Sequence, residues 1–405
     1  MFGFLRRKNK RPVIYSRKEH CISRANIDPD ALKVLYRLSQ LGYTAYLVGG
    51  GVRDLLLGRT PKDFDVATSA TPGEVRRAFR NCFLIGRRFR LAHVRFGDKI
   101  IETATFRQDS QTVGEIIEHA AEGPHEDNTF GTPETDAYRR DFTVNGLFYN
   151  IEDFSVIDWV GGMKDLEKRV IRTIGDPEVR FREDPVRMMR AVRLSARLGF
   201  RIERKTAAAM KKCHSCILSA AVPRVCEEVF RLFAFGHSAE SFRLMYECGM
   251  LGDLMPSFSK FLDGDGGVKS KTFKYLGMLD KYEKMMMEKG FEVSNGLRAA
   301  VLLTGMFLAE NKDGAGRRIM QEMHAALKTP KAVYFTGVLL MESMKRLASP
   351  PTKSKQRFIY NKDFLDALDY NRIILRAEKK NEKTLNEWAD LYEEKGKQDE
   401  PQDQP

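Results

Sequence analysis

The stretch LVGGGVRDLLLG, residues 47–58, places three consecutive glycines between a short apolar run and a segment with helical character. It is followed at residues 61–70 by PKDFDVATSA, in which Asp63 and Asp65 are separated by one residue. Side chains two apart in a strand lie on the same face, so a strand here would bring both carboxylates together. Because like charges at close range repel, this pair indicates a neutralising partner.

A divalent cation would neutralise the carboxylate pair. Mg²⁺ binds one or two carboxylates together with phosphate oxygens, and Mn²⁺ suits the same oxygen ligands. Gly50 and its neighbours allow backbone N–H groups to approach a phosphate, and Arg53 can add a charge-assisted contact. The two stretches therefore predict a triphosphate site with a metal held by Asp63 and Asp65. The simpler alternative is a glycine turn followed by two solvated aspartates.

The residues on both sides of these stretches predict a small α+β unit. Asp28 and Pro29 fit the start of a helix that Gly42 ends. A capping box and Pro72 indicate another helix at TPGEVRRAF, residues 71–79. Five apolar runs are typical of strands: TAYLV (44–48), DFDVAT (63–68), CFLIG (82–86), AHVRF (92–96) and IIETATF (100–106).

The rest of the chain is predicted to be mainly helical. Helical periodicity dominates from residue 163, although residues 263–330 are loosely patterned, and the polar stretch 107–137 is typical of a mobile insertion. The expected fold class is α+β: a head with a small mixed β-sheet and helices, then an all-α neck, body and tail. The predicted divisions are a basic flexible arm (1–25), the head (26–162), two helical regions (163–260 and 261–394) and a disordered polar tail (395–405).

Composition narrows the class of partner. The chain of 405 residues has 68 Lys and Arg against 55 Asp and Glu, a formal net charge of +13. This charge favours a polyanion such as nucleic acid, with an anionic membrane surface or no such partner as alternatives. No apolar run approaches the ~20 residues that span a bilayer. Six cysteines are sparse for this length, which predicts reduced thiols and a cytoplasmic location.

Further polar residues extend the candidate site. Glu102 could complete a carboxylate cluster or deprotonate a hydroxyl, or it could pair with an arginine. In RRDFTVN, residues 139–145, Arg140 could neutralise phosphate and Asp141 could position a ribose or stabilise the arginines. Asn145 could supply a directional amide contact. An N-capping aspartate in a basic surface turn is the alternative interpretation of this stretch.

A stripe of arginines follows in EDPVRMMRAVRLSARLG, residues 183–199. Asp184 is predicted to cap a helix that Gly199 ends. Four arginines at spacings of three and four fall in one arc beside a core-facing arc of apolar residues, which indicates phosphate or base contacts. A solvated basic face is the alternative. The arginines are Arg187, Arg190, Arg193 and Arg197.

Two other patterns carry less information. Cys213 and Cys216 flank a histidine in a lone CxxC, and a zinc site would need a second ligand pair, so we predict an ordinary helical segment. His93 is expected to pack or hydrogen-bond, because chemistry assisted by a metal needs no histidine base.

The motifs occur together and in order, and as a set they resemble class II template-independent RNA nucleotidyltransferases, a superfamily of tRNA CCA-adding enzymes and bacterial poly(A) polymerases. The resemblance covers residues 40–200, about half the chain. Residues 86–94, GRRFRLAHV, resemble the signature of the poly(A) polymerase branch. The motifs that carry the resemblance are LVGGGVRDLLLG, DFDVAT, RRDFTVN, VGGMKDL and REDPVRMMRAVRL.

This resemblance implies a role for each matching residue. Asp63 and Asp65 would bind two catalytic metals, and Asp141 matches a position assigned to the active site. Phosphate or sugar contacts would come from Gly50, Arg53 and Arg140. Base reading would come from Asp184 and Arg187, assisted by Arg190 and Arg193.

The activity that the resemblance implies is addition of AMP from ATP to RNA 3′ ends, by in-line attack of the 3′-hydroxyl on the α-phosphorus. A tRNA CCA- or A-adding enzyme is the alternative within the class, and a catalytically silent RNA-binding protein is the alternative outside it. DNA is not an expected partner, a monomer is the default, and membrane association stays open. Relatives often end in a long basic tail, whereas residues 393–405 are acidic and polar, so RNA contacts are expected in the helical region and at RRKNKR (6–11).

Overall fold

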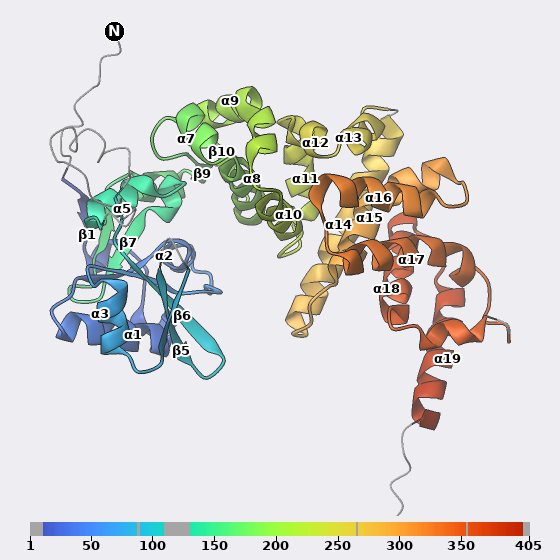
Figure 1. The fold of residues 1–405 in the computed structure, drawn as a ribbon, viewed down its shortest axis with the longest axis horizontal. Helices are drawn as coiled ribbons and strands as arrows, with labels where there is room; N and C mark the ends of the chain where they lie inside the picture. Colours follow the sequence, from blue (N-terminus) through green and yellow to red (C-terminus); the bar gives the residue numbers. More distant parts are fainter. Residues whose placement is uncertain (1–10, 87–89, 109–129, 265, 354, 400–405) are drawn as a thin grey trace, which may run out of the picture. The chain divides into compact units, whose positions relative to one another are not determined.

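The computed structural model describes residues 11–86, 90–108, 130–264, 266–353 and 355–399. The chain divides into two compact units (Figure 1). The first comprises Met1–Arg180 with Arg201–Thr206, and the second comprises Phe181–Phe200 with Ala207–Pro405. Within the described residues, no helix is long and apolar enough to cross a membrane. Each unit has its own core, so each is described by itself.

The first unit is built on an eight-stranded sheet with the order β1-β8-β7-β2-β3-β6-β5-β4. The β3 and β6 strands run parallel and the other neighbouring strands run antiparallel, which confirms the predicted mixed sheet. The strands are β1 (Val13–Tyr15), β2 (Ala45–Val48), β3 (Asp65–Thr68), β4 (Cys82–Ile85), β5 (Leu91–Phe96), β6 (Lys99–Thr105), β7 (Leu147–Asn150) and β8 (Val156–Asp158).

Short helices connect these strands. Their ends follow the predicted capping residues: the Asp28 carboxylate accepts hydrogen bonds from two N–H groups of α1, and Thr71 forms a capping box with Glu74 at the start of α3. The helices of this unit are α1 (Pro29–Gln40), α2 (Gly50–Leu56), α3 (Pro72–Ala78), α5 (Pro133–Arg139) and α6 (Gly162–Glu167), with 3₁₀ turns at Arg17–Glu19, Arg24–Asn26 and Thr143–Asn145.

The predicted strand DFDVAT begins two residues later than expected. β3 starts at Asp65, which lies opposite Val48 at the end of β2. Gly49 has φ 72° and turns the neighbouring chain away from the sheet, so residues 63 and 64 have no partner on β2. Asp63 is therefore in the exposed segment before the strand, and Phe64 is half-buried rather than part of the core.

Three segments predicted to be irregular contain regular structure. In the predicted flexible arm, Val13–Tyr15 form β1, because this β-branched and aromatic triplet pairs with β8. α5 lies at the end of the predicted mobile insertion, where Thr132 and Pro133 begin a helix. α19 extends to Asp399, so residues 395–399 of the predicted disordered tail are helical. Residues 1–10, 109–129 and 400–405 lie outside the described residues.

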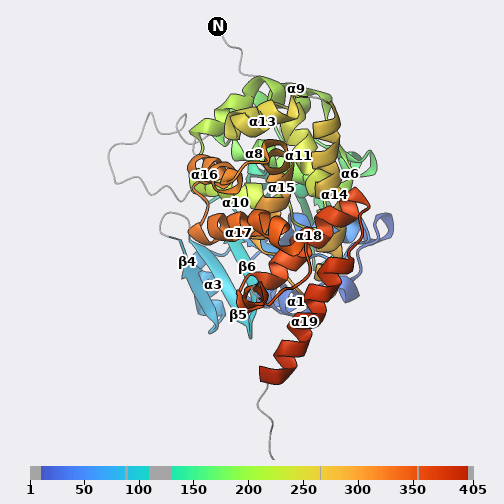
Figure 2. The same cartoon turned by 90° about the vertical axis from the view of Figure 1, so that its right-hand side faces the viewer.

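The second unit is helical (Figures 1 and 2). α15 contacts α14, α16, α17 and α18, so most of its residues are buried. This explains why residues 295–310, within the loosely patterned stretch, lack one-sided periodicity although they are helical. The helices from the unit boundary onward are α7 (Pro177–Glu183), α8 (Val186–Leu198), α9 (Arg204–Cys213), α10 (Val222–Arg231), α11 (Ser238–Glu247), α12 (Met250–Leu254), α13 (Pro256–Leu262), α14 (Gly266–Glu288), α15 (Asn295–Glu310), α16 (Ala315–Leu327), α17 (Lys331–Leu347), α18 (Phe364–Glu378) and α19 (Lys383–Asp399), with 3₁₀ turns η5 (His214–Ser219) and η6 (Gln356–Tyr360).

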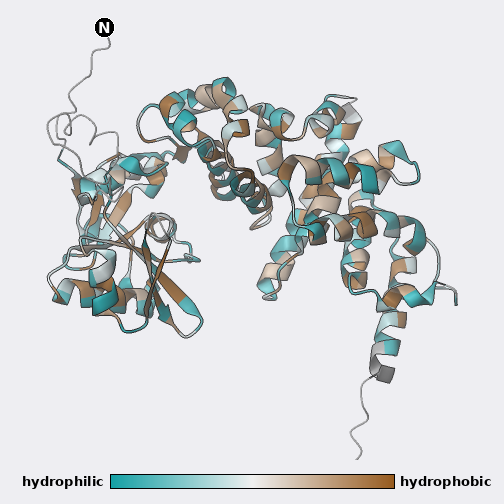
Figure 3. Ribbon diagram, in the orientation of Figure 1, coloured by the Kyte–Doolittle hydropathy of each residue, from teal (hydrophilic) through white to brown (hydrophobic). Residues whose placement is uncertain are grey.

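Hydrophobic and hydrophilic residues are interspersed along the outer helices of this unit, as Figure 3 shows. The apolar arc predicted for residues 183–199 is buried in α8, and Gly199 ends that helix with φ 69°. A small feature was not predicted: β9 (Val170–Ile171) pairs in parallel with β10 (Arg201–Ile202) in the first unit. The finer division of the helical part into neck, body and tail stays a prediction.

Candidate active site

Asp65 is the most strongly perturbed carboxyl of the site. It is the first residue of β3, at the middle of the sheet, next to the point where β2 turns into the glycine loop. Burial and the negative charge of Glu102 raise the pKa of Asp65 to about 6; Asp63 adds to the rise and Arg140 opposes it. Asp63 therefore lies close enough to act on Asp65, although only Asp65 belongs to the strand.

The glycine loop lies against the same carboxyl. A Cβ atom placed on Gly49 would be 3.0 Å from Arg140 Nη1 and 3.8 Å from an Asp65 carboxylate oxygen. A Cβ on Gly50 would be 3.4 Å from Arg53 Nη2. The loop thus fits between an acidic and a basic side chain only because it lacks side chains of its own. The sequence argument placed Gly50 in the site but did not single out Gly49.

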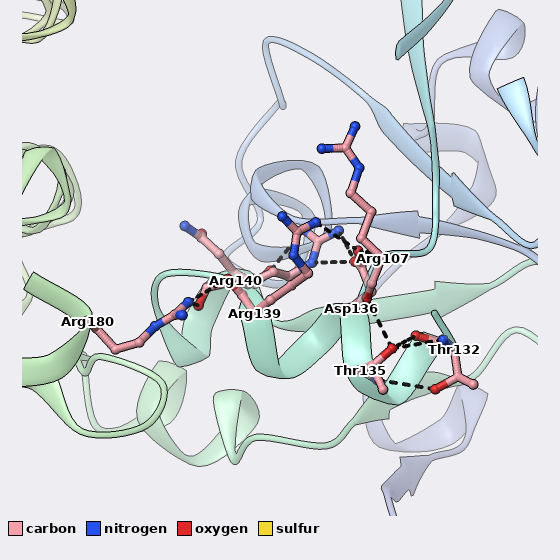
Figure 4. Close-up of polar contacts among 8 residues, drawn as sticks. Arg107, Thr132, Thr135, Asp136, Arg139, Arg140 and Arg180 are labelled. Atoms are coloured by element: carbon pink, nitrogen blue, oxygen red, sulfur yellow. Dashed lines mark hydrogen bonds and ion pairs between the residues drawn. The ribbon is translucent and has the colours of Figure 1, made fainter. Parts of the chain in front are cut away.

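Arg140 is held over this loop by Asp136, a residue that sequence reasoning missed. Figure 4 shows both side chains at the end of α5. Arg140 donates from Nε and Nη2 to Asp136 Oδ2 at 3.2 and 3.0 Å, and its guanidinium lies 5.0 Å from the centre of the Phe148 ring. The signal available in the sequence was the spacing of four residues between Asp136 and Arg140 in a helix.

Arg180 contributes a second support (Figure 4). This buried side chain donates from Nη2 to the backbone carbonyls of Arg139 and Arg140, at 2.6 and 3.0 Å. Because these carbonyls end α5, a guanidinium is favourable there. Asp136 and Arg180 together fix both the side chain and the backbone of Arg140, which pre-organises a cation beside Asp65.

Arg53 and Asp141 belong to a buried hydrogen-bond chain. Arg53 is 3% exposed; its guanidinium pairs with Asp54 at 2.7 Å and donates to Asn145 Oδ1 at 2.6 Å. Asn145 Nδ2 in turn donates to Asp141 Oδ1 at 3.1 Å, and that oxygen also accepts the Phe142 N–H at 2.8 Å. The structure thus links Arg53, Asn145 and Asp141, and the Arg53 end of this hydrogen-bond chain lies against Gly50.

Glu102 lies on the exposed side of β6. It lies opposite His93 in the β5–β6 ladder, and His93 Nε2 is 3.8 Å from its carboxylate. Its charge acts on the pKa of Asp65, so the sequence argument that placed Glu102 near the carboxylate pair is consistent with the geometry. In the signature at residues 86–94, residues 87–89 lie outside the part of the chain that the structure describes.

The predicted base-reading residues belong to the second unit. Asp184 is not the N-cap of α8, since the capping position is Pro185; its carboxylate instead accepts from Arg224 Nη2 at 2.9 Å. Arg187 is paired with Glu183 one turn earlier, at 3.0 Å. These ion pairs give Asp184 and Arg187 defined orientations in this structure. Their part in a nucleotide site stays a prediction.

The arginine stripe on α8 is half-buried rather than a solvated face. Arg193 Nε donates to the buried carboxylate of Glu228 on α10, at 3.2 Å. Arg197 lies 4.2 Å from the centre of the Phe235 ring. Two of the four arginines therefore help to attach α8 to its neighbours, which the spacing alone does not reveal. Arg190 is also half-buried.

The residues of the first unit fit a divalent cation. Among the described residues, no group of three or more His, Cys, Asp and Glu side chains is arranged to hold a metal ion. A metal here would be bound by Asp63 and Asp65, with phosphate oxygens and water as further ligands. Burial and the neighbouring carboxylates raise the pKa of Asp65, and this unfavourable ionisation is the observation that favours a metal, because a bound cation stabilises the ionised carboxylate. His214, within the lone CxxC, forms a hydrogen bond through Nδ1 with the Asp253 carboxylate at 2.6 Å, which accounts for this histidine without a metal.

The raised pKa predicts that Asp65 destabilises the metal-free protein above about pH 6. The folded protein retains a proton that the unfolded chain has released, so stability is unaffected below about pH 4 and falls as pH rises through about 6. We expect Asp65→Asn to be more stable than the wild type in EDTA at neutral pH, by about 3 kcal/mol, and therefore to unfold at a higher temperature. Near pH 4 the two proteins should unfold at similar temperatures.

Thermal melts at both pH values measure this, with the fully exposed Asp98→Asn as the control. Adding a divalent metal at neutral pH should remove the advantage of Asp65→Asn, because only the wild type gains a ligand. An equal difference at both pH values would show that burial of this carboxyl is not the cause.

Comparisons with known proteins show the family to which the chain belongs. Residues 45–172, which include the glycine loop, Asp63, Asp65 and Arg140, match the family model described as "Poly A polymerase head domain". Residues 199–262 match the model described as "Probable RNA and SrmB- binding site of polymerase A". The chain is therefore a nucleotidyltransferase.

The chain belongs to the poly(A) polymerase family. It is 49% identical over 346 residues to Poly(A) polymerase I of Escherichia coli, which covers 84% of this chain and 72% of that protein. The CCA-adding enzyme of Lactobacillus helveticus is a more distant relative, 36% identical over 229 residues, 56% of this chain and 55% of that protein. The Bacillus stearothermophilus CCA-adding enzyme in complex with CTP has a similar structure, with a TM-score of 0.69 and 26% identity over 92% of this chain and 83% of that one.

Proposed function

We propose that this protein adds AMP from ATP to RNA 3′ ends without a template, releases pyrophosphate, and acts in the processing and decay of RNA in the cytoplasm. The observation that carries the proposal is the meeting of Asp65, Gly49 and Arg140 where the central strands β2 and β3 adjoin the glycine loop, in a chain 49% identical to Poly(A) polymerase I over most of its length. The position of a carboxyl, a glycine loop and a fixed cation in contact supports phosphoryl-transfer chemistry.

Asp63 and Asp65 hold two divalent metals in this proposal, with Mg²⁺ as the expected ion and Mn²⁺ as a possible substitute. When bound, one metal would lower the pKa of the attacking 3′-hydroxyl and the other would stabilise the leaving oxygens. The glycine loop, with Gly50 at the start of α2, leaves backbone N–H groups accessible to the triphosphate. Arg140 places a guanidinium beside the same loop and neutralises phosphate charge.

Arg53 and Asp141 act through the loop in this proposal. Arg53 is too buried to be an open phosphate ligand, so we assign it to holding the loop and Asn145 in position. Asp141 accepts a hydrogen bond from the Asn145 amide nitrogen, and the amide oxygen of Asn145 therefore faces Arg53. This refines the direct phosphate contact that the resemblance implied for Arg53.

Asp184 and Arg187 read the adenine edge in this proposal, and Arg190 and Arg193 assist them. A carboxylate and a guanidinium can together match the donors and acceptors of one base. The ion pairs with Arg224 and Glu183 would hold the two side chains in the orientation that favours ATP. The protein is proposed to act as a monomer on RNA, without DNA as a partner.

Replacing Arg187 by alanine is expected to lower the preference for ATP over CTP by about tenfold, because one good base contact contributes about 1–3 kcal/mol of discrimination. Incorporation of each nucleotide on the same RNA measures this ratio. Arg182→Ala, at an exposed position of α7, is the matched control. An unchanged ratio in Arg187→Ala would reject the base-reading role.

A gel assay with one labelled nucleotide at a time tests the proposed function. The substrates are an unstructured RNA and a tRNA that lacks its terminal nucleotides. A long ladder with ATP on both RNAs, and little addition of CTP, would establish poly(A) polymerase activity. The similarity to a CCA-adding enzyme bound to CTP makes tRNA repair the second candidate. That candidate predicts addition that stops after a few nucleotides, on tRNA alone.

A further inference from the structure

Three adjoining pockets lie in the second unit, between the end of α15, α16, α17 and η6. Their volumes are about 420, 470 and 720 Å³, and Arg346 lines all three. They therefore form one continuous concave surface, which we call the Arg346 surface. It lies outside residues 45–172 and 199–262, the two regions that match family models.

The Arg346 surface is strongly basic. Two of its cations are neutralised locally: Arg317 pairs with Glu342 at 3.7 Å and Lys345 with Asp313 at 2.6 Å. Among the described residues that line the three pockets, Glu342 and Asp313 are the only acidic ones. The lining cations are Lys312, Arg317, Lys345, Arg346, Lys355 and Arg357, so positive charge is in clear excess. A surface of this kind attracts a polyanion.

Aromatic rings are exposed between these cations. Phe335 on α17 and Tyr360 at the end of η6 are each 64% exposed, although large rings are normally covered. Phe358 between them is largely buried, and the Arg346 guanidinium lies 4.6 Å from the centre of its ring. The ring and the guanidinium thus offer flat, fixed faces. Flat faces separated by cations suit bases and phosphates in alternation.

We propose that the Arg346 surface binds single-stranded RNA, with bases stacked on Phe335 and Tyr360 and phosphates near Arg346, Lys355 and Arg357. This inference rests on the proposed function, because it takes the RNA substrate as the ligand. The pocket that contains Tyr360 is lined by Arg346, Lys355, Arg357, Phe358, Tyr360 and Asn361, a set without a carboxylate. Its stacking faces favour RNA over an acidic peptide, which would need the charge but not the rings. The surface is a binding site for the RNA chain and takes no part in the chemistry.

Direct binding tests this proposal without any need for catalysis. Fluorescence anisotropy with the full-length protein, a labelled oligoadenylate of about 15 nucleotides and EDTA measures affinity alone. We expect Phe335→Ala with Tyr360→Ala to weaken binding about tenfold, since each stacked base contributes appreciably. Phe291→Ala removes a ring of similar exposure, 62%, from the same unit and should bind like the wild type.

The salt dependence of binding tests the charge contacts separately. Arg357→Gln should reduce the slope of log affinity against log salt by about 1, because one phosphate contact is lost. Lys289→Gln, at an exposed position after α14, should leave the slope unchanged. Photocrosslinking with an RNA that carries 5-iodouridine is expected to place an adduct on Tyr360 or Phe335.

Wild-type affinity in the double aromatic variant would overturn the proposal, and so would an effect equal to that of Phe291→Ala. If the double variant kept its RNA affinity but lost affinity for oligoglutamate, the surface would be a peptide site and the proposal would be wrong. Nucleotide addition is measured independently on the same samples. A protein that binds RNA through this surface but adds no nucleotide would refute the proposed function and retain the binding site.

Discussion

Replacing either Asp63 or Asp65 by alanine is expected to reduce nucleotide addition by about a thousandfold or more, because metal assistance supplies several kcal/mol of the barrier reduction. The two residues lie close together in the site but differ in burial: Asp65, at the start of the central strand β3, is half-buried, and Asp63 is exposed. Both residues are nonetheless required, because either substitution would leave the protein only one carboxylate with which to bind metal. Incorporation of labelled AMP into RNA at saturating ATP measures the loss.

Matched controls separate this effect from damage to the fold. Asp98→Ala removes an exposed carboxylate from the β5–β6 turn of the same unit and should leave activity unchanged. RNA affinity should persist in all three variants, because the contacts proposed for RNA are in the second unit. Mn²⁺ binding, followed by electron paramagnetic resonance, should weaken only in the two site variants. Full activity in Asp63→Ala or Asp65→Ala would refute the metal assignment.

Signals between residues close together in the chain explain how much of the secondary structure could be predicted from the sequence. Asp28 and Thr71 in the head, and Gly199 in the second unit, act within one helical turn, so their positions alone predict the helix ends. The strands after residue 80 were predictable for a similar reason: short apolar runs with a Gly-Asp turn favour a hairpin. These features depend on neighbours in the chain and survive in any tertiary context.

The failures arose where distant partners decide the structure. β1 is too short to be predicted alone and forms because β8 offers it an edge. Asp184 has the residue type of a cap, but Arg224, forty positions later, competes for its carboxylate. α15 lacks one-sided periodicity because it is surrounded by other helices. In each case the information is present in the sequence, but only as pairs of residues that the fold brings together.

The residues of the candidate site also fall into those predictable from neighbours in the chain and those that depend on distant partners. The carboxylates and glycines were identifiable because they are dense in one short stretch. Their supporting residues were not, since Asp136 and Arg180 are ordinary residues until the fold places them beside Arg140. Arg53 was expected at the phosphates; it is buried close to Gly50, and the proposed function assigns it to holding the loop in position. The sequence therefore indicated the reacting groups better than the groups that position them.

Replacing Gly49 by alanine is expected to lower kcat/KM for ATP by about a hundredfold while the protein stays folded, because a displacement of about 1 Å is enough for such a loss. Gly49 has φ 72° and ψ −136°, a conformation that residues with a side chain rarely adopt. The new Cβ would also be 3.0 Å from Arg140 Nη1, so the guanidinium or the loop must move. Either movement separates the cation from Asp65.

Gly58→Ala distinguishes backbone strain from this displacement. Gly58 also has a positive φ, 66°, but nothing lies within 4 Å of a Cβ placed there. Gly58→Ala should therefore lose about 1–2 kcal/mol of stability from the unfavourable φ alone, and Gly49→Ala should lose at least as much, because its Cβ also meets Arg140. Only Gly49→Ala should lose activity, and its KM for ATP should rise because the triphosphate meets a displaced Arg140. Equal activity in the two variants would mean that the close approach of Gly49 to Arg140 and Asp65 has no part in binding the nucleotide.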